Sequence, residues 1–377
     1  MGILIGADFV PTNSNQKLFE EADVEQLIGL ELCNLFKNSD YRIMNLELPL
    51  IDYKNPIDKY GPNLLASTRS INAYKKLNVD IMTLANNHIM DQGEEGLYST
   101  VKILQEANIQ YVGLVGNSFE NNQFTCFEFQ NKKVGIYACA EHEFSTLNLW
   151  ENRANPYIEN ATNLHIQDLK KQCDYVIVLY HGGKEYYRYP SPELQERCRN
   201  MVSSGANLII CQHSHCIGCE EKYKESTIVY GQGNFLFDIS DNHYCKTGLL
   251  ININSKFEIE YIPIVKKGNT ITIAKTNERN KILEEFYERS NKVNDNFVNE
   301  NYNEFSKEML DKYIWILSGR ETLLFRIINK CSFGKLRKYY LGKKYNRKQL
   351  MKIYNCLICE AHKELLIKGL ENKLYEK

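Results

Sequence analysis

The chain has 377 residues, of which 43% are hydrophobic and 25% charged, and its formal net charge is −1 at neutral pH. This composition is typical of a soluble globular protein with room for one large α/β domain and an appendage. The first residues, MGILIGADF, already form an apolar run, and no stretch of about 20 apolar residues occurs. We therefore expect neither a secretory signal nor a membrane span. The protein is expected to be cytoplasmic, with free thiols at its twelve cysteines.

Three apolar runs near the N-terminus end in polar side chains. The run at residues 3–11 (ILIGADFVP) contains Asp8 near its end, and the run at residues 41–50 (YRIMNLELPL) contains Asn45 and Glu47. Residues 80–93 (DIMTLANNHIMDQG) deliver Asn86, Asn87, His88 and Asp91. A single acidic residue after a strand is most often a cap or loop residue, but the same pattern at several strand ends favours a common site.

Two later apolar runs end in histidine. Residues 176–181 (VIVLYH) end at His181, and residues 207–215 (NLIICQHSH) carry His213 and His215. A lone histidine is more often a core residue than a metal ligand. In an extended segment, however, residues two apart share one face, so His213 and His215 could bind one metal or one each of an adjacent pair. Buried parallel strands end at a common edge, which predicts that the three imidazoles converge.

A rival interpretation involves the C-x-x-C pair that follows the two histidines. His213, His215, Cys216 and Cys219 have residue types that bind a structural zinc ion. This alternative would separate the H-x-H segment from any catalytic centre.

Helical and extended patterns alternate along the first 276 residues. Apolar residues recur with helical spacing in residues 24–36, 69–77, 97–107 and 191–205. The alternation with apolar strands predicts a sheet layered with helices. We expect further strands at residues 124–129, 133–140, 248–254 and 257–264, some of them antiparallel. Together these strands would form a second sheet. From about Asn277 the pattern is helical.

Five of these segments, NLELPL, ANNHIMDQGEEGL, HGGKEY, QHSHCIG and YGQGNFLFD, occur in the order and spacing of a known family. They resemble the CapA capsule-synthesis family, which is associated with poly-γ-glutamate capsules and belongs to the calcineurin-like metallophosphoesterase superfamily. The resemblance covers about residues 2–265. It implies an α/β fold, a four-layer αββα sandwich, which we place over residues 1–276. The helical pattern and the charge of the remaining sequence predict a basic, mainly helical C-terminal region over residues 277–377.

The resemblance also implies a site with two divalent metal ions. The implied ligands are Asp8, Glu47 as the bridging carboxylate, Asn87, His181, His213 and His215. His88 would protonate the leaving group with Asp91 orienting it, and Glu185 and Asn234 would bind substrate. Oxygen and imidazole ligands together favour Mn²⁺, with Fe²⁺ or Zn²⁺ as alternatives.

Two departures from the superfamily pattern keep a second function open. The first superfamily motif is D-x-H, but this chain has Val10 in place of the histidine, and Glu47 replaces an aspartate. One tightly held metal is therefore an alternative to two. The retained His88 favours a phosphoester hydrolase, whereas the missing imidazole favours a non-catalytic component that binds metal and a polyanion within a capsule assembly system.

The C-terminal region carries a concentration of positive charge. Residues 281–377 hold 20 Lys plus Arg against 13 Asp plus Glu, and between Arg326 and Lys352 ten basic residues occur without an acidic one. Such a run is most often a solvated helical face. The functional alternative is contact with an anionic substrate, a polymer intermediate or the inner face of a membrane, beside other capsule-biosynthesis proteins. Nucleic acid is not expected, because no nucleic-acid-binding motif accompanies the charge.

Overall fold

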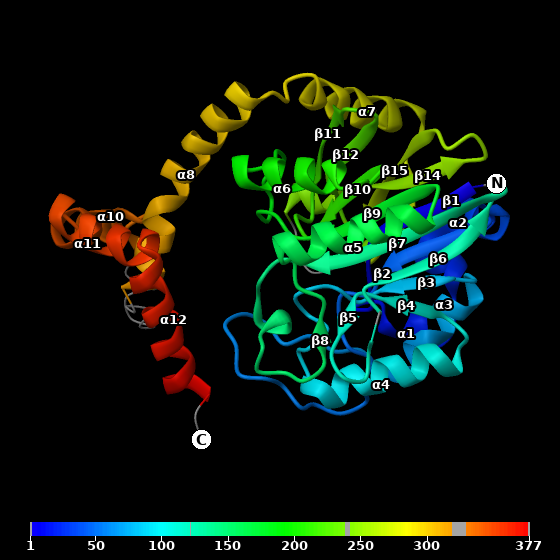
Figure 1. Cartoon of the computed structure of the whole chain (residues 1–377), viewed down its shortest axis with the longest axis horizontal. Coiled ribbons are helices and arrows are strands. Elements are labelled where there is room, and N and C mark those ends of the chain that lie inside the picture. The colour runs from blue at the N-terminus through cyan, green and yellow to red at the C-terminus, as the bar shows by residue number, and fades with distance from the viewer. Residues whose placement is uncertain (1, 121, 238–241, 319–328, 376–377) are drawn as a thin grey trace. The chain divides into compact units, whose positions relative to one another are not determined.

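The computed structural model describes residues 2–120, 122–237, 242–318 and 329–375 (Figure 1). It forms two compact units, Met1–Asn299 and Glu300–Lys377. The sequence pattern predicts the domain boundary after residue 276. Helix α7 (Thr276–Ser290) belongs to the first unit because Phe286 is fully buried there and Arg289 Nε donates to Gly218 O at 2.8 Å.

The first sheet combines parallel and antiparallel strands. In spatial order it contains β16 (Thr270–Ile273), β15 (Ile259–Lys267), β14 (Thr247–Asn254), β1 (Gly2–Val10), β2 (Tyr41–Asn45), β3 (Ile81–Thr83) and β4 (Gln110–Val112), and β13 (Leu236–Phe237) pairs with the end of β1. Strands β1 to β4 are parallel, whereas β14, β15 and β16 run antiparallel to their neighbours. The carboxyl ends of β1, β2 and β3 therefore meet at one edge.

The second sheet has a parallel centre and antiparallel edges. Its order is β11 (Ile217–Tyr223), β12 (Ser226–Gln232), β10 (Leu208–Gln212), β9 (Tyr175–His181), β7 (Lys132–Ala140) and β6 (Phe124–Phe129). A separate pair joins β5 (Leu114–Val115) and β8 (Arg153–Ala154). The central strands are buried along almost their whole length, which explains their continuous apolar sequences.

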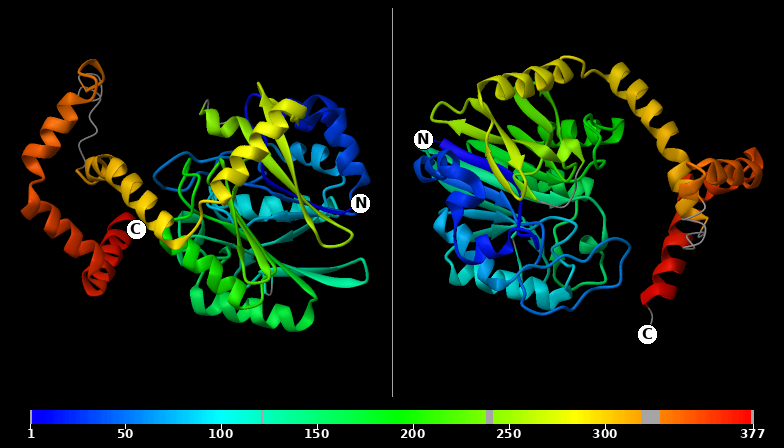
Figure 2. Two further views of the ribbon diagram at one scale, coloured as in Figure 1. Left: turned by 90° about the horizontal axis from the view of Figure 1, so that it is seen from above. Right: turned by 180° about the vertical axis from the view of Figure 1, so that it is seen from behind.

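Helices cover the outer faces of both sheets and give the predicted four layers. The first sheet packs on α1 (Gln16–Glu20), α2 (Val24–Asn38), α3 (Ile71–Lys76) and α4 (Gly93–Glu106), and the second on α5 (Glu159–Gln172) and α6 (Pro192–Ser203). A third apolar cluster draws on both sheets and fills the space between them. Figures 1 and 2 show the two sheets face to face between these helices. The predicted α/β sandwich is confirmed.

The predicted composition of the second sheet was wrong in part. Residues 248–254 and 257–264 form β14 and β15, which extend the first sheet. Their alternating pattern shows that they are strands, but the choice of sheet depends on β14 pairing with β1 in antiparallel register, from Gly2 opposite Asn254 to Ile5 opposite Ile251. Such a long-range pairing leaves no local signal in the sequence.

An irregularity in β1 ties the two sheets together just before the site. The register between β1 and β2 shifts between Ile5 and Asp8. Two glutamines from the second sheet bond to the carbonyl groups in this stretch: Gln232 Nε2 donates to Ile5 O at 2.6 Å, and Gln212 Nε2 to Gly6 O at 3.4 Å. Both glutamines are the last residues of their strands, so these bonds fix the ends of β10 and β12 against β1.

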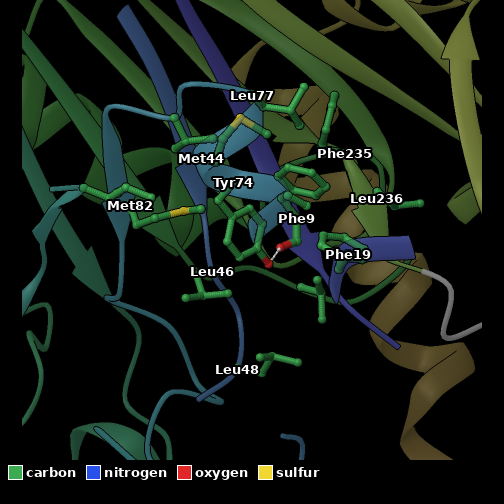
Figure 3. Close-up of a cluster of buried hydrophobic side chains, with 14 of the residues drawn as sticks. Phe9, Phe19, Met44, Leu46, Leu48, Tyr74, Leu77, Met82, Phe235 and Leu236 are labelled. Carbon is green, nitrogen blue, oxygen red and sulfur yellow. Dashed lines mark hydrogen bonds between the residues drawn. The ribbon is translucent and has the colours of Figure 1, made fainter. Parts of the chain in front are cut away.

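An aromatic cluster supports β1 from the helical side (Figure 3). The Phe9 ring lies 5.0 Å from the Tyr74 ring and 4.8 Å from the Phe235 ring, centroid to centroid. Tyr74 is fully buried, and its hydroxyl donates to Phe9 O at 2.9 Å. Because Phe9 follows Asp8, this contact also fixes the backbone that presents the Asp8 carboxylate.

Tyr74→Phe is expected to destabilise the protein by about 1–2 kcal/mol, because the buried Phe9 carbonyl loses its partner while the ring packing is kept. Urea unfolding measures the change. Tyr53→Phe is the matched control: it removes a hydroxyl that donates to Glu95 at 3.0 Å from a side chain that is 58% exposed. Equal unfolding free energies for the two variants would contradict the role given to the Tyr74 hydroxyl.

The second unit is helical. It contains most of α8 (Asp295–Leu317), together with α10 (Lys335–Lys344), α11 (Arg347–Ile358) and α12 (Glu360–Tyr375). Its small core is built on Ile314, Trp315 and Leu341. No described helix combines the length and the hydrophobicity needed to cross a bilayer.

Candidate metal centre

Strands from both sheets deliver the predicted site residues. Asp8 lies near the end of β1, Glu47 two residues after β2, and Asn87 in the turn after β3. From the second sheet, His181 ends β9, and His213 and His215 follow β10. All six residues are buried, with no more than 8% of any of them exposed. The predicted convergence at the strand ends is therefore observed, and it involves the edges of two sheets.

Five of these residues form two groups that share one carboxylate. The first group is Asp8, Glu47 and His215, and the second is Glu47, His181 and His213. Within each group the candidate ligand atoms lie within 4.8 Å of one another. Carboxylate and imidazole ligands in this arrangement have the composition of a divalent metal site. His213 and His215 belong to different groups, which agrees with the interpretation that each binds one of two adjacent metals.

Close contacts connect the two sheets inside the cluster. His181 Nε2 lies 3.2 Å from Glu47 Oε1 and 3.0 Å from Asn87 Oδ1. His215 Nδ1 lies 3.4 Å from Asp8 Oδ2. Asn87 thus joins the second group through His181.

Several polar atoms in the cluster have no hydrogen-bond partner. Asp8 Oδ2 and both carboxylate oxygens of Glu47 are buried and accept no hydrogen bond from the protein. Burying carboxylate oxygens without a partner is costly, and buried charges are normally paired or bound to metal. The unpaired oxygens point to a cation as the missing partner, so the residues present fit a divalent ion.

Electrostatics keep two of the histidines in the form that binds metals. Burial lowers the pKa of His181 to about 4 and the pKa of His213 well below its usual value. Both imidazoles are therefore neutral at pH 7 and offer a nitrogen lone pair. Burial, followed by the nearby Asp8 carboxylate, raises the pKa of Glu47 well above its ordinary range.

Asp8 and His215 behave as an ion pair. Burial acts against charge on both, but the attraction between the two groups, whose Nδ1 and Oδ2 atoms lie 3.4 Å apart, outweighs it. The pKa of Asp8 is lowered to about 2 and the pKa of His215 is raised to about 9. A positive charge beside Asp8 and Glu47 is therefore stabilised by this part of the cluster.

The two histidines after β10 adopt an unusual backbone. His213 has φ 83° and His215 has φ 55°, so neither is extended. The extended geometry assumed for H-x-H was wrong, because the chain leaves β10 at Gln212 and turns sharply. Left-handed φ values are uncommon in residues other than glycine, and strained examples cluster at functional sites. The turn sends the two imidazoles into different metal-ligand groups.

A network of amides fixes the turn that carries Asn87. Asn45 Nδ2 donates to Asp8 Oδ1 at 2.7 Å, and Asn45 Oδ1 accepts from Asn86 Nδ2 at 3.2 Å. Asn86 Oδ1 in turn accepts from the backbone N–H of His88 at 3.1 Å. Asn45 and Asn86, which were predicted at strand ends, therefore orient Asp8 and the backbone of His88. All four residues are buried.

His88 and Asp91 form the predicted pair, and a lysine completes it. His88 Nδ1 lies 2.6 Å from Asp91 Oδ2, and Leu64 N donates to the same oxygen at 2.6 Å. Lys59 Nζ pairs with Asp91 Oδ1 and lies 3.3 Å from His88 Nδ1. The Lys59 side chain is only 4% exposed. Sequence reasoning missed Lys59 because it lies in an irregular loop without periodicity.

Lys59→Met is expected to cost about 3 kcal/mol of stability, because it leaves the fully buried Asp91 without its cationic partner. Urea unfolding tests this value. Lys171→Met is the matched control, since Lys171 pairs with Asp168 while 74% of its side chain is exposed, and a change within 0.5 kcal/mol is expected there, roughly the value of a surface pair. If Lys59→Met proved as mild as Lys171→Met, the buried pair would not contribute as described.

The two residues predicted to bind substrate, Glu185 and Asn234, differ in their positions. Glu185 is exposed in the loop after β9 and belongs to neither group. Asn234 is buried, and its Oδ1 lies 2.8 Å from His215 Nδ1. Glu141, which was not predicted, places Oε1 3.7 Å from His213 Nε2. It directly follows β7, so the strand-end pattern used elsewhere could have found it.

The rival zinc site is not formed. Cys219 is buried in the apolar cluster between the second sheet and its helices, and Cys216 Sγ lies 3.6 Å from Tyr187 O. Neither cysteine belongs to the two metal-ligand groups found among the described residues. Strand β11 begins at Ile217 and carries Cys219 away from the histidines.

Two helix-covered sheets with a buried carboxylate and imidazole cluster at their strand ends define an α/β sandwich with a candidate metal centre. The chain belongs to the family of bacterial capsule synthesis protein PGA_cap, whose sequence model matches residues 5–239. The resemblance inferred from the five motifs is thereby confirmed. The matched range contains every residue of the two metal-ligand groups.

Curated relatives carry names consistent with this family. The chain is 31% identical over 217 residues to the capsule biosynthesis protein CapA of Bacillus anthracis, covering 54% of this chain and 51% of the relative. It is 28% identical over 241 residues to the PGA biosynthesis protein CapA of Bacillus subtilis, covering 61% of this chain and 63% of the relative. The chain thus spans about half to two thirds of the length of these relatives.

Solved structures show a weaker likeness. A phosphatase from Mycoplasma pneumoniae has a TM-score of 0.44 at 16% identity, covering 70% of this chain and 93% of that one. A putative 5′-nucleotidase from Staphylococcus aureus has a TM-score of 0.42 at 14% identity, covering 75% and 58% respectively. Because these scores are below 0.5, the fold assignment rests on the strand order and layers described above.

Proposed function

We propose that this chain is a metal-dependent phosphoesterase that acts in the synthesis of a capsule, poly-γ-glutamate or related exopolymer. The sharing of Glu47 by two buried groups of ligands is the observation that carries the proposal. Membership of the capsule synthesis family supports the biological setting. In that setting the substrate or a polymer intermediate is anionic, and other capsule-biosynthesis proteins are the expected partners.

Asp8, Glu47 and His215 would hold one ion, and Glu47, Asn87, His181 and His213 the other. Two divalent ions held in this way would stabilise the negative charge that develops during displacement at phosphorus. Mixed oxygen and imidazole ligands favour manganese, with iron and zinc as the alternatives.

His88 supplies the proton for the leaving oxygen. It directly follows Asn87 in the chain, and its backbone N–H donates to Asn86 Oδ1 at 3.1 Å. Asp91 holds Nδ1 of its ring, which leaves Nε2 as the atom that carries the transferred proton. Lys59 and Leu64 N hold the Asp91 carboxylate in turn, so the orientation of His88 is fixed by a buried chain of contacts. Asn234 and Glu185 remain candidates for substrate contact.

The test is turnover of simple phosphoesters by the purified, manganese-loaded chain. An aryl phosphate monoester and the matching diester should each be tried with and without a chelator. The proposal is supported if the phenol is released only in the presence of manganese and if the His88→Asn variant does not release it. Bound metal without turnover on a broad panel of phosphoesters would contradict it.

One observation favours a second function. Val10, where the superfamily motif has an imidazole, is fully buried in the apolar cluster on the helical side of the first sheet. The first group therefore has three ligand residues, and its ion would keep an open position. A non-catalytic component that binds metal and an anionic polymer is the alternative that such an incomplete site supports. Metal-dependent polymer binding without hydrolysis would distinguish it.

A further inference from the structure

The second unit carries a run of exposed basic side chains. Residues 329–352 contain nine basic residues and no acidic residue: Lys330, Lys335, Arg337, Lys338, Lys343, Lys344, Arg347, Lys348 and Lys352. All of them except Arg337, which is half-buried, are exposed. Arg326, the first residue of the predicted basic run, lies outside the described residues. The basic surface is defined here as these nine side chains, eight of them on α10 and α11 and one, Lys330, just before the turn that precedes α10.

Large apolar side chains are exposed within the same segment. Phe333 is 93% exposed, and Tyr339, Met351, Tyr354 and Leu357 are between 52% and 68% exposed. Exposed apolar side chains are unremarkable when single, but here five of them accompany the basic surface within 25 residues, 333 to 357. Positive charge together with exposed apolar side chains indicates a partner that is both anionic and apolar.

These apolar side chains are not the ones that stabilise the unit. Leu341 is buried with Ile314 and Trp315, and Leu350 and Ile353 pack against that cluster. On α11 the inward residues Leu350 and Ile353 thus alternate with the outward residues Met351 and Tyr354. The helices are held by one apolar face and expose a second one.

Phe333 is the most exposed of the group, and its backbone explains why. It has φ 50° and precedes Gly334 with φ 78°, which together form a tight turn before α10. Lys330 and Lys335 flank it in the sequence. A phenyl ring at the tip of a turn between lysines can enter the interface of a bilayer while the ammonium groups contact lipid phosphates.

We propose that this surface docks the chain onto an anionic lipid bilayer. Cationic side chains draw the unit to anionic headgroups, and Phe333, Met351 and Leu357 enter the boundary between headgroups and acyl chains. Nucleic acid would use the charge and the aromatic rings, but Met351 and Leu357 have no aromatic face on which a base could stack. A soluble polyanion would leave all the apolar side chains in water. The inference is independent of the metal centre.

The test uses the full chain and vesicles of phosphatidylcholine in which about one third of the lipid is phosphatidylglycerol. Replacing Lys338, Lys343, Lys348 and Lys352 with glutamine is expected to weaken cosedimentation with these vesicles by roughly a hundredfold or more. The matched control replaces four exposed lysines of the first unit with glutamine, Lys37, Lys75, Lys102 and Lys256. It changes the net charge equally and is expected to bind as the wild type does.

A second variant tests the apolar contribution. Phe333→Asn should keep the turn, because asparagine tolerates positive φ, and is expected to weaken vesicle binding about tenfold. Equal binding by the two four-lysine variants would overturn the proposal. So would full binding by Phe333→Asn, which would indicate a polyanion site, or tighter binding of the chain to duplex DNA than to the vesicles at the same salt concentration.

Discussion

Glu47→Leu is expected to remove both metal ions from the protein. Glu47 is the only residue common to the two metal-ligand groups, and leucine offers no ligand atom while it fills a similar volume. The variant should nevertheless fold. Both oxygens of Glu47 are buried and accept no hydrogen bond from the protein, so an apolar side chain removes a costly buried group. Metal content by mass spectrometry and urea unfolding of the metal-free proteins measure the two effects.

The control for this variant is Glu141→Gln. Glu141 Oε1 lies 3.7 Å from His213 Nε2, but Glu141 belongs to neither group and its side chain is 24% exposed. We expect Glu141→Gln to keep the wild-type metal content. If Glu47→Leu retained an ion while Glu141→Gln lost one, the shared position of Glu47 would not be what holds the metals.

His88→Asn is expected to lower the rate of phosphoester hydrolysis by about 10²–10⁴-fold while the metal content stays that of the wild type. The imidazole lies beside the cluster but outside both groups, so its loss removes a proton donor and leaves the ligands in place. The side chain is only 11% exposed, and asparagine can still approach Asp91. Steady-state rates and metal content should be measured on the same preparations.

His213→Ala provides the contrast. It removes a ligand of the second group, so metal and activity should fall together. If His88→Asn also lost metal, His88 would be acting as a ligand and its assignment as the proton donor would be wrong. Unchanged turnover in both variants would end the hydrolase account.

The positions of the site residues could be predicted because apolar strands are easily recognised and their ends carry the chemistry. Asp8, Glu47 and His181 all lie at or just after a buried strand. The division of His213 and His215 between two groups could not be predicted, because it depends on a left-handed turn that the residue types do not favour. Lys59 was missed for a related reason, since only tertiary folding brings its loop to Asp91.

The fold was predictable at the level of layers and less so in its connections. Helical spacing identified α2, α4 and α6, and apolar runs identified the central strands. The assignment of β14 and β15 to a sheet depended on antiparallel pairing with β1, at a separation of about 250 residues in the sequence. The end of the first unit depended on packing of Phe286, which no local pattern distinguishes from other helical residues.

We propose that the cluster of Asp8, Glu47, His181, His213 and His215 binds two metal ions. The most direct test is the metal content of the purified wild-type chain after equilibration with manganese, measured by mass spectrometry and normalised to protein concentration. Two ions per chain are expected, one for each group that Glu47 joins. One ion or none would contradict the account, and would leave the incomplete site of a non-catalytic component as the better description of this protein.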